Sequence, residues 1–210
     1  PNVLHGLEME RLCSASGPTK GEILIQGKKP KEVVFIHCVG SRDKTVGNEY
    51  CSRVCCMYTA KQAHLLRDKI PEARLTVLYM DVRAFGKGFE EFYERVQKEH
   101  VIYRKGNPSE IYRKNGKLIV RGEDTLLGEP FELEADLVVL AGGLEPRKEE
   151  DFLRGLLGLE KSPDRFYAEA PGLDPIMTRV EGIFLSGCCQ GPKDIPDTVA
   201  QASGAASLAC

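Results

Sequence analysis

The sequence predicts an α/β fold, a three-layer parallel sheet with a β-meander, followed by part of a second α/β subdomain. Continuous apolar runs of strand length occur at residues 32–38, 74–81 and 136–143, as expected of buried parallel strands. Segments with helical periodicity follow the first two runs. A stretch of alternating residues around Asn115-Gly116, a favoured hairpin turn, precedes the third. Together these patterns indicate a doubly wound domain with a meander inserted before its closing strand.

The first half of this domain alternates strands and helices. The strand at residues 32–38 leads through a polar loop to a helix at 52–69, where apolar residues recur three and four positions apart and Pro71 follows the end. The run at 74–81 is the second strand. An amphipathic helix is expected at 88–100, with a short third strand at 101–106.

The second half of the domain changes to antiparallel signals. Residues 110–122 read as a hairpin, and residues 124–135 cross back into the strand at 136–143, which ends in two glycines. The whole arrangement spans residues 31–145 and would form one domain.

The two ends of the chain have weaker patterns. Residues 1–30 are rich in turn signals and are expected to be mainly loop, and residues 151–181 are expected to be short and irregular. One more strand is predicted at 182–187. A helix is predicted from about Pro196, because proline suits the first helical turn.

Composition excludes several classes of function. The formal net charge is only −2, and no basic stripe indicates nucleic acid. No apolar run approaches the roughly 20 residues that a membrane span requires. No secretory signal is visible, which favours a cytoplasmic location. The chain begins as if within a domain, so we expect a fragment of a longer protein.

Eight cysteines are the most informative residues. Without an export signal, a disulfide framework is the less favoured interpretation. Twelve residues separate Cys38 from Cys51, three separate Cys51 from Cys55, and Cys56 follows directly. Four thiolates are the usual complement of an iron–sulfur cluster, whereas zinc sites prefer paired cysteines two to four apart. Cluster ligation, zinc binding and simple packing of buried cysteines all remain open from the spacing alone.

The predicted fold makes a shared site feasible. Cys38 would end the first strand at the carboxyl edge of the sheet, and Cys51 would lie in the following loop. Cys55 and Cys56 would lie in the first helical turn, where the positive helix end favours anionic thiolates. His37 is expected to point away from Cys38 and to be packed or hydrogen-bonded rather than a ligand.

A nicotinamide-binding loop is not apparent at this position. The stretch "HCVGSRD" contains only Gly40 where a G-x-G-x-x-G motif would be needed. Arg42 and Arg53 could hold phosphate, although charged loop residues are usually solvated. We therefore expect the cysteines to occupy the place that a pyrophosphate would otherwise take.

Four stretches carry a resemblance to a known family. They are "HCVGSRD…YCSRVCCMYTAKQA", "YMDVRAFGKGFEEFYERV", "EDTLLGE" and "GCCQGPKDIPDTVAQAS". Together they resemble the A-type subunit of heterodisulfide reductase, within the thioredoxin reductase-like superfamily of two-dinucleotide flavoproteins. The resemblance runs over nearly the whole chain and implies a pyridine-nucleotide-disulfide-reductase-like fold.

The resemblance implies a domain organisation and two cofactors. Residues 1–30 would be an N-terminal remnant of the FAD domain, 31–145 an NAD(P)-binding-like domain with an iron–sulfur site, and 146–210 the C-terminal part of the FAD domain. The cofactors would be FAD and a [4Fe–4S] cluster. Cluster ligation carries over from the family to Cys38, Cys51, Cys55 and Cys56.

The resemblance also indicates where a flavin would lie. The related flavoproteins have Gly-Asp after the last FAD strand, whereas this chain has Gly187-Cys188 and so departs from the family at that contact. Lys193 and the start of the last helix would favour negative charge on a reduced flavin. A capped surface helix is the alternative. The residues expected at the flavin are Gly187, Cys188, Gly191, Pro192, Lys193, Asp194, Ile195 and Thr198.

Taken together, these features predict an oxidoreductase that passes electrons between FAD and iron–sulfur clusters, with no catalytic residue assigned in this chain. By the resemblance, its partners are other heterodisulfide reductase subunits and a hydrogenase or formate dehydrogenase that supplies electrons. FAD is expected in the full-length protein but not in this fragment alone. A second copy of the chain could cover the last helix, giving a homodimer. The alternatives are an NAD(P)H-dependent disulfide reductase and a zinc-stabilised assembly domain without redox turnover.

Overall fold

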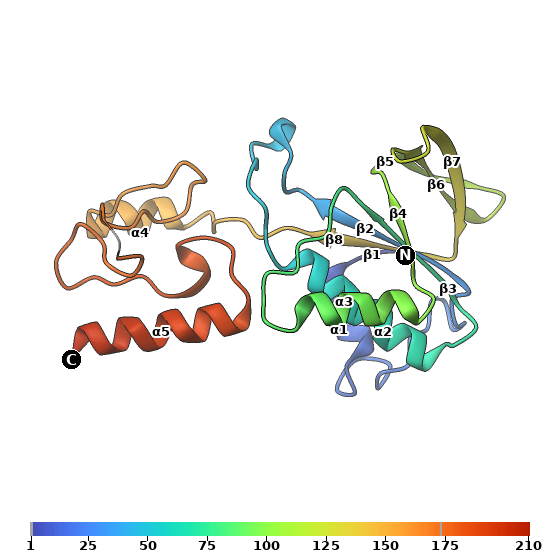
Figure 1. Cartoon of the computed structure of the whole chain (residues 1–210), viewed down its shortest axis with the longest axis horizontal. Coiled ribbons are helices and arrows are strands. Elements are labelled where there is room, and N and C mark those ends of the chain that lie inside the picture. The colour runs from blue at the N-terminus through green and yellow to red at the C-terminus, as the bar shows by residue number, and fades with distance from the viewer. Residues whose placement is uncertain (1, 173) are drawn as a thin grey trace. The chain divides into compact units, whose positions relative to one another are not determined.

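The computed structural model describes residues 2–172 and 174–210, and these form two compact units (Figure 1). The first unit consists of the chain up to Val39 together with Cys55–Gly142. The second consists of Gly40–Val54 and Gly143–Cys210. The chain therefore leaves the first unit after Val39, returns at Cys55 and leaves again after Gly142.

A five-stranded parallel sheet forms the middle layer of the first unit. Its strand order is β1-β8-β2-β3-β4, and each neighbouring pair is parallel. The strands are β1 (Val3–His5), β2 (Glu32–Val39), β3 (Arg74–Tyr79), β4 (Ile102–Lys105) and β8 (Leu137–Gly142). Six consecutive residues of β2 are buried, because this central strand is covered on both faces.

Helices cover one face of this sheet and a three-stranded antiparallel sheet covers the other (Figure 1). Side chains alternate along β2, so Phe35 packs among the helices while Val34 and Ile36 pack against the meander. The helices are α1 (Gly6–Cys13), α2 (Cys55–Lys69) and α3 (Phe89–Lys98). The meander strands are β5 (Pro108–Lys114), β6 (Lys117–Asp124) and β7 (Glu129–Ala135).

Among its described residues, the second unit has little regular structure apart from two α-helices. Its buried centre includes Phe166, against which Tyr50 packs edge to face at 5.4 Å between ring centroids. The Tyr50 hydroxyl donates to the Leu144 carbonyl at 2.8 Å, and the Leu144 N–H donates to the Ser52 hydroxyl at 2.9 Å. Its elements are η1 (Lys44–Val46), α4 (Glu150–Leu157), η2 (Gly187–Cys189) and α5 (Ile195–Ala209).

The predicted α/β class, the parallel sheet and the meander are confirmed. The strand expected at 182–187 is wrong. Among the described residues this segment makes only an isolated bridge between Met177 and Phe184, and a strand needs a continuous neighbour. The sequence patterns also fail to reveal two helices. Helix α1 lies within the expected loop of residues 1–30, and α4 opens the stretch expected to be irregular.

None of the described helices combines the length and apolar character that a membrane-spanning segment needs. The assignment of residues 1–30, 31–145 and 146–210 to domains of a larger flavoprotein stays a prediction. In the structure, β1 pairs with β8 and the side chain of Met9 in α1 belongs to the core of the first unit.

Candidate functional site

Three of the four predicted ligand thiols lie together in the first unit. Cys38 is the penultimate residue of β2, and Cys55 and Cys56 are the first two residues of α2. The three form a buried cluster with Ala141 of β8, and their exposed fractions are 7%, 0% and 5%. The carboxyl ends of neighbouring parallel strands and a helix N-terminus thus converge on the thiols, as the sequence predicted.

The backbone at Cys38 adopts a conformation that is unusual for a side-chain-bearing residue. Its φ is +57°, in the left-handed region, and the pairing of β2 with β8 shifts register between Ile36 and Val39. A non-glycine residue in this region typically carries strain, which persists only where surrounding structure enforces it. The irregularity lies near the end of β2, at the residue whose thiol joins the cluster.

Hydrogen bonds among the thiols shift the pKa values of Cys55 and Cys56 in opposite directions. Hydrogen bonds with the Cys38 and Cys56 thiols, together with burial, raise the pKa of Cys55. The hydrogen bond from Cys55 lowers the pKa of Cys56, and it outweighs the opposing effect of burial. The cluster therefore favours one thiolate even in a buried setting. A thiolate is the form of cysteine that binds metals.

The His37 imidazole lies close enough to Cys56 to help lower that thiol's pKa. By strand alternation His37 shares the face of Val33 and Phe35, which pack among the helices, so the departure from alternation is at Cys38, whose backbone is left-handed. The side chain is 1% exposed. Neither ring nitrogen has a well-aligned hydrogen-bond partner within the described residues. His37 is thus part of the wall around the thiols.

Tyr58 closes another part of this wall. Its hydroxyl donates to the Gly142 carbonyl at 2.9 Å, which fixes the first turns of α2 against the end of β8. Burial, with a contribution from the neighbouring Cys55, raises the pKa of the Tyr58 hydroxyl. Tyr58 therefore stays neutral where it packs against the thiols.

The fourth predicted ligand, Cys51, belongs to the second unit. Its sulfur accepts a hydrogen bond from the Arg53 N–H at 3.3 Å within its own loop. Within residues 2–172 and 174–210, no three side chains of His, Cys, Asp or Glu are arranged as a metal site. The donor set fits an iron–sulfur cluster in its chemistry, with three adjoining buried thiols, one of them favouring the thiolate. Ligation itself stays a prediction.

The predicted flavin residues lie in the second unit around η2 and the start of α5. Asp194 is the N-cap, and its carboxylate accepts from the Asp197 N–H at 2.8 Å. The Lys193 ammonium donates to the Gln190 side chain at 2.8 Å. Burial, with help from the positive charge of Arg53, lowers the pKa of Lys193.

Gly187 is suited to its place for two reasons. Its φ is +76°, and a Cβ there would come within 3.2 Å of the Thr198 methyl group on α5. Gly187 and Thr198 are thus brought together, whereas the Ile195 side chain is 80% exposed. The remaining members of the predicted set, which are half-buried or exposed on the same segment, are Cys188, Gly191 and Pro192.

Sequence reasoning missed Gln201 of α5, whose side chain links this helix to the segments around Pro175 and Gly187. Its side-chain carbonyl accepts from the Gly187 N–H at 2.7 Å. Its amide donates to Gln190 at 2.6 Å and to the Pro175 carbonyl at 3.2 Å. A large polar residue on an otherwise small-residue helix face was the signal that could have revealed it.

Related sequences are found among characterised proteins, although no family model matches the chain. The A-type subunit of the H(2):CoB-CoM heterodisulfide,ferredoxin reductase of Methanothermobacter marburgensis is 54% identical, over 99% of this chain and 32% of the relative. The H(2)/formate-dependent counterpart of Methanococcus maripaludis is 50% identical over 98% of this chain and 32% of the relative. The chain spans about a third of the length of these relatives.

Solved structures confirm the fold. A thioredoxin reductase of T. acidophilum matches with a TM-score of 0.58 over 85% of this chain and 51% of that chain, at 18% identity. A thioredoxin reductase of Lactococcus lactis matches with a TM-score of 0.56 over the same shares, at 21% identity. This likeness shows a thioredoxin reductase-like fold. By sequence, the chain is homologous over nearly its whole length to part of the A-type subunit of heterodisulfide reductase, as its motifs predicted.

Proposed function

We propose that these residues form an electron-transfer segment of an A-type heterodisulfide reductase subunit, contributing an iron–sulfur site and one wall of a flavin site. The observation that carries the proposal is the buried cluster of Cys38, Cys55 and Cys56, in a chain 54% identical to such a protein. The relatives are oxidoreductase subunits, and the redox chemistry of the complete protein is inferred from them.

The iron–sulfur site would be a [4Fe–4S] cluster held by Cys38, Cys51, Cys55 and Cys56. When bound, the cluster supplies one-electron transfer. The chain's own residues prepare the place. Helix α2 directs its positive end at the thiols, and Tyr58 with its partly buried neighbours Met80 and Val82 limits access of water. Burial and nearby hydrogen-bond donors are the features that set the potential of such a site.

The flavin site would be completed by FAD held mainly by residues outside this chain. Here Gly187, Cys188, Gly191, Pro192, Lys193, Asp194, Ile195 and Thr198 would form the wall near the isoalloxazine ring. Lys193 lies beside the N-terminus of α5, so its charge and the helix end would both favour a reduced, anionic flavin. The flavin supplies two-electron chemistry when bound.

The names of the relatives support the assembly that we propose. They are subunits of reductases named for H₂ or for H₂/formate, for the CoB-CoM heterodisulfide and for ferredoxin. We therefore propose the remaining heterodisulfide reductase subunits and a hydrogenase or formate dehydrogenase as partners, in the cytoplasm. Exposed apolar side chains support further contacts, including a homodimer. They include Phe152 and Leu156 on α4, 76% and 69% exposed, and Ile195 and Val199 on α5, 80% and 59% exposed.

Iron, acid-labile sulfide and zinc in the anaerobically purified full-length protein test the cluster. Because other clusters would add to the total, the measurement is the difference between variants. Cys55→Ser and Cys56→Ser should each lose about four irons relative to the parent protein, as a cubane implies. The matched controls Cys13→Ser and Cys210→Ser should lose none.

Two outcomes would contradict the assignment. Unchanged iron in both ligand variants would remove these thiols from any cluster. Loss of zinc in place of iron would favour an assembly domain without redox turnover. An NAD(P)H-dependent disulfide reductase is supported only by the fold likeness, and the chain lacks a C-x-x-C redox pair.

A further inference from the structure

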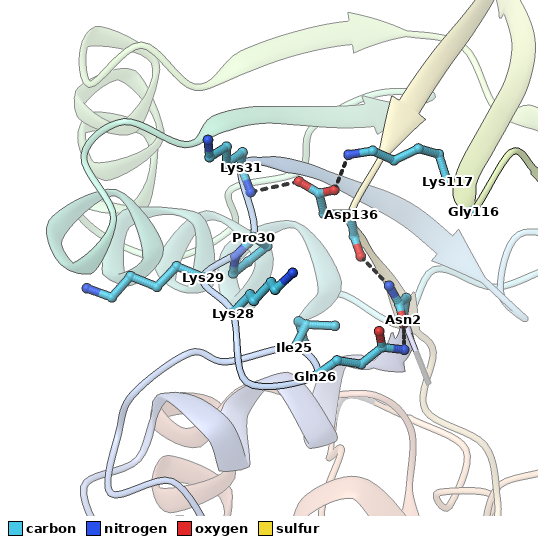
Figure 2. A pocket seen from close by; sticks show the side chains of 10 residues that line it. All are labelled: Asn2, Ile25, Gln26, Lys28, Lys29, Pro30, Lys31, Gly116, Lys117 and Asp136. Carbon is cyan, nitrogen blue, oxygen red and sulfur yellow. Dashed lines mark hydrogen bonds and ion pairs between the residues drawn. The ribbon is translucent and has the colours of Figure 1, made fainter.

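A cavity lies at the opposite end of the parallel sheet from the thiols. Its volume is about 500 Å³, and it opens where the 25–31 segment, the turn between β5 and β6 and the start of β8 meet (Figure 2). Cavities of this size are typical of small-molecule sites. Its wall includes Lys31, directly before β2, whereas Cys38 lies near the other end of that strand. The eight residues of β2 span about 25 Å, so the cavity is separate from the thiol cluster.

A hydrogen-bonded frame holds the cavity in shape. The Asp136 carboxylate accepts from the backbone N–H groups of Lys31 and Glu32, at 2.9 and 3.1 Å, and it pairs with the Lys117 ammonium. The Asp136 carbonyl accepts from the Asn2 amide at 2.9 Å, and Gln26 donates to Asn2 at 3.1 Å. Figure 2 shows this chain of contacts running along the wall. Asp136 is the only carboxylate among the described residues of the lining, so within this part of the chain no lining carboxylate is left to neutralise further lysines.

The charge of the lining is strongly positive. Lys28, Lys29 and Lys31 are exposed, and within the described residues none of their ammonium groups has an ion-pair partner. Figure 2 shows their side chains leaving the segment in different directions, with that of Lys29 extending away from Asp136 and Lys117. Three unneutralised cations around one concavity repel one another. This cost is relieved when an anion enters.

We propose that this cavity binds a phosphate-bearing small molecule with at least two charged groups. The spread of the lysines suits an extended anion better than a single compact one, and a concave site with a fixed polar frame suits a small molecule better than a flat protein surface. Lysine is a common phosphate binder that acts as a point charge. The ligand class is therefore a polyphosphate ester or a comparable organic polyanion.

Calorimetric titration of the full-length protein with inorganic tripolyphosphate, compared with inorganic phosphate, tests the proposal. We expect saturable binding of tripolyphosphate, weakened roughly fivefold in Lys28→Gln/Lys31→Gln, given the modest energy of each exposed charge pair. These substitutions leave the frame intact, because Lys31 contributes to it through its backbone. Lys87→Gln/Lys98→Gln removes the same charge from exposed positions outside the cavity and should leave the affinity unchanged.

Hydrogen–deuterium exchange localises the binding. Tripolyphosphate should slow amide exchange in residues 25–31 and 115–117 of the parent protein. It should not do so in Lys28→Gln/Lys31→Gln. Equal weakening in the two double variants would show diffuse attraction and overturn the proposal. So would an absence of saturable binding. Tight binding of a glutamate-rich peptide without binding of tripolyphosphate would assign the cavity to an acidic protein partner instead.

Discussion

Gln201 accepts a hydrogen bond from the backbone N–H of Gly187 at 2.7 Å, joining α5 to the turn that precedes it. Both groups are buried. Replacing Gln201 with leucine keeps the volume but leaves the Gly187 donor unpaired, which typically costs about 1–3 kcal/mol. We expect Gln201→Leu to lower the urea midpoint of unfolding accordingly. The exposed Gln97 of α3 provides the control Gln97→Leu, which should change stability little. An equal change in stability from both substitutions would show that the buried hydrogen bond between Gln201 and Gly187 adds no stability of its own.

Nicotinamide nucleotides should bind poorly. The pyrophosphate of such a cofactor normally rests on glycine-rich backbone at a helix N-terminus. In this chain the equivalent helix begins with Cys55 and Cys56, which are 0% and 5% exposed. We expect no saturation of the protein by NADH or NADPH up to millimolar concentrations in a calorimetric titration. Saturable binding in the micromolar range would refute this expectation and revive the disulfide reductase interpretation.

The 210-residue chain produced by itself should purify without stoichiometric FAD. It contains no G-x-G-x-x-G motif to fix the pyrophosphate. The N-terminal end of α5 stabilises a nearby negative charge by only about 0.3–1 kcal/mol. This is far below the binding free energy that tight retention of FAD requires. Flavin absorbance relative to protein, after denaturation, measures this directly. A ratio near one would show that these residues hold the cofactor unaided.

Asp136 should make stability depend on pH in acid. Burial raises its pKa, but the Lys117 ammonium and the backbone N–H groups of Lys31 and Glu32 outweigh this and hold it below the usual 3.8. The unfolded chain therefore binds the proton more readily, so stability falls as the pH drops from about 3.8 through the folded-state pKa. Above that window, Asp136→Asn should lose about 1–2 kcal/mol, since charge-assisted hydrogen bonds are lost.

Urea unfolding at several pH values tests this. The free energy of unfolding of Asp136→Asn should lack the part of the parent protein's decrease in acid that comes from this carboxylate. The exposed Asp164 gives the control Asp164→Asn, which should follow the parent protein at each pH. Parallel loss of stability in parent and Asp136→Asn throughout the acid range would exclude the role assigned to this carboxylate.

The buried sheet was predictable because its signal is local. Continuous apolar runs such as that of β2 occur where a strand is covered on both faces, and the hairpin turn at Asn115-Gly116 is specified by two residues. Helix α1 was missed because the neighbouring turn signals dominate the composition. Its start depends on a reciprocal contact between His5 and Glu8, which is a less familiar capping pair than serine with glutamate.

The site was predictable only in part. The convergence of Cys38, Cys55 and Cys56 follows from the order of strand, loop and helix. That His37 and Cys38 both lie at the thiol cluster could not be inferred, because strand alternation places neighbouring residues on opposite faces unless the backbone is irregular, as it is at Cys38. Gln201 was equally hidden, since its partners are backbone groups brought together by irregular loops.

The left-handed backbone at Cys38 has a consequence for how this position can vary among related chains. Glycine or asparagine would adopt a φ of +57° more readily than cysteine does. Drift under selection for backbone stability alone would therefore move the position toward those residues. A cysteine that is retained here is held against that tendency. Its persistence across an alignment of homologues would measure selection on the thiol itself, separately from selection on the fold.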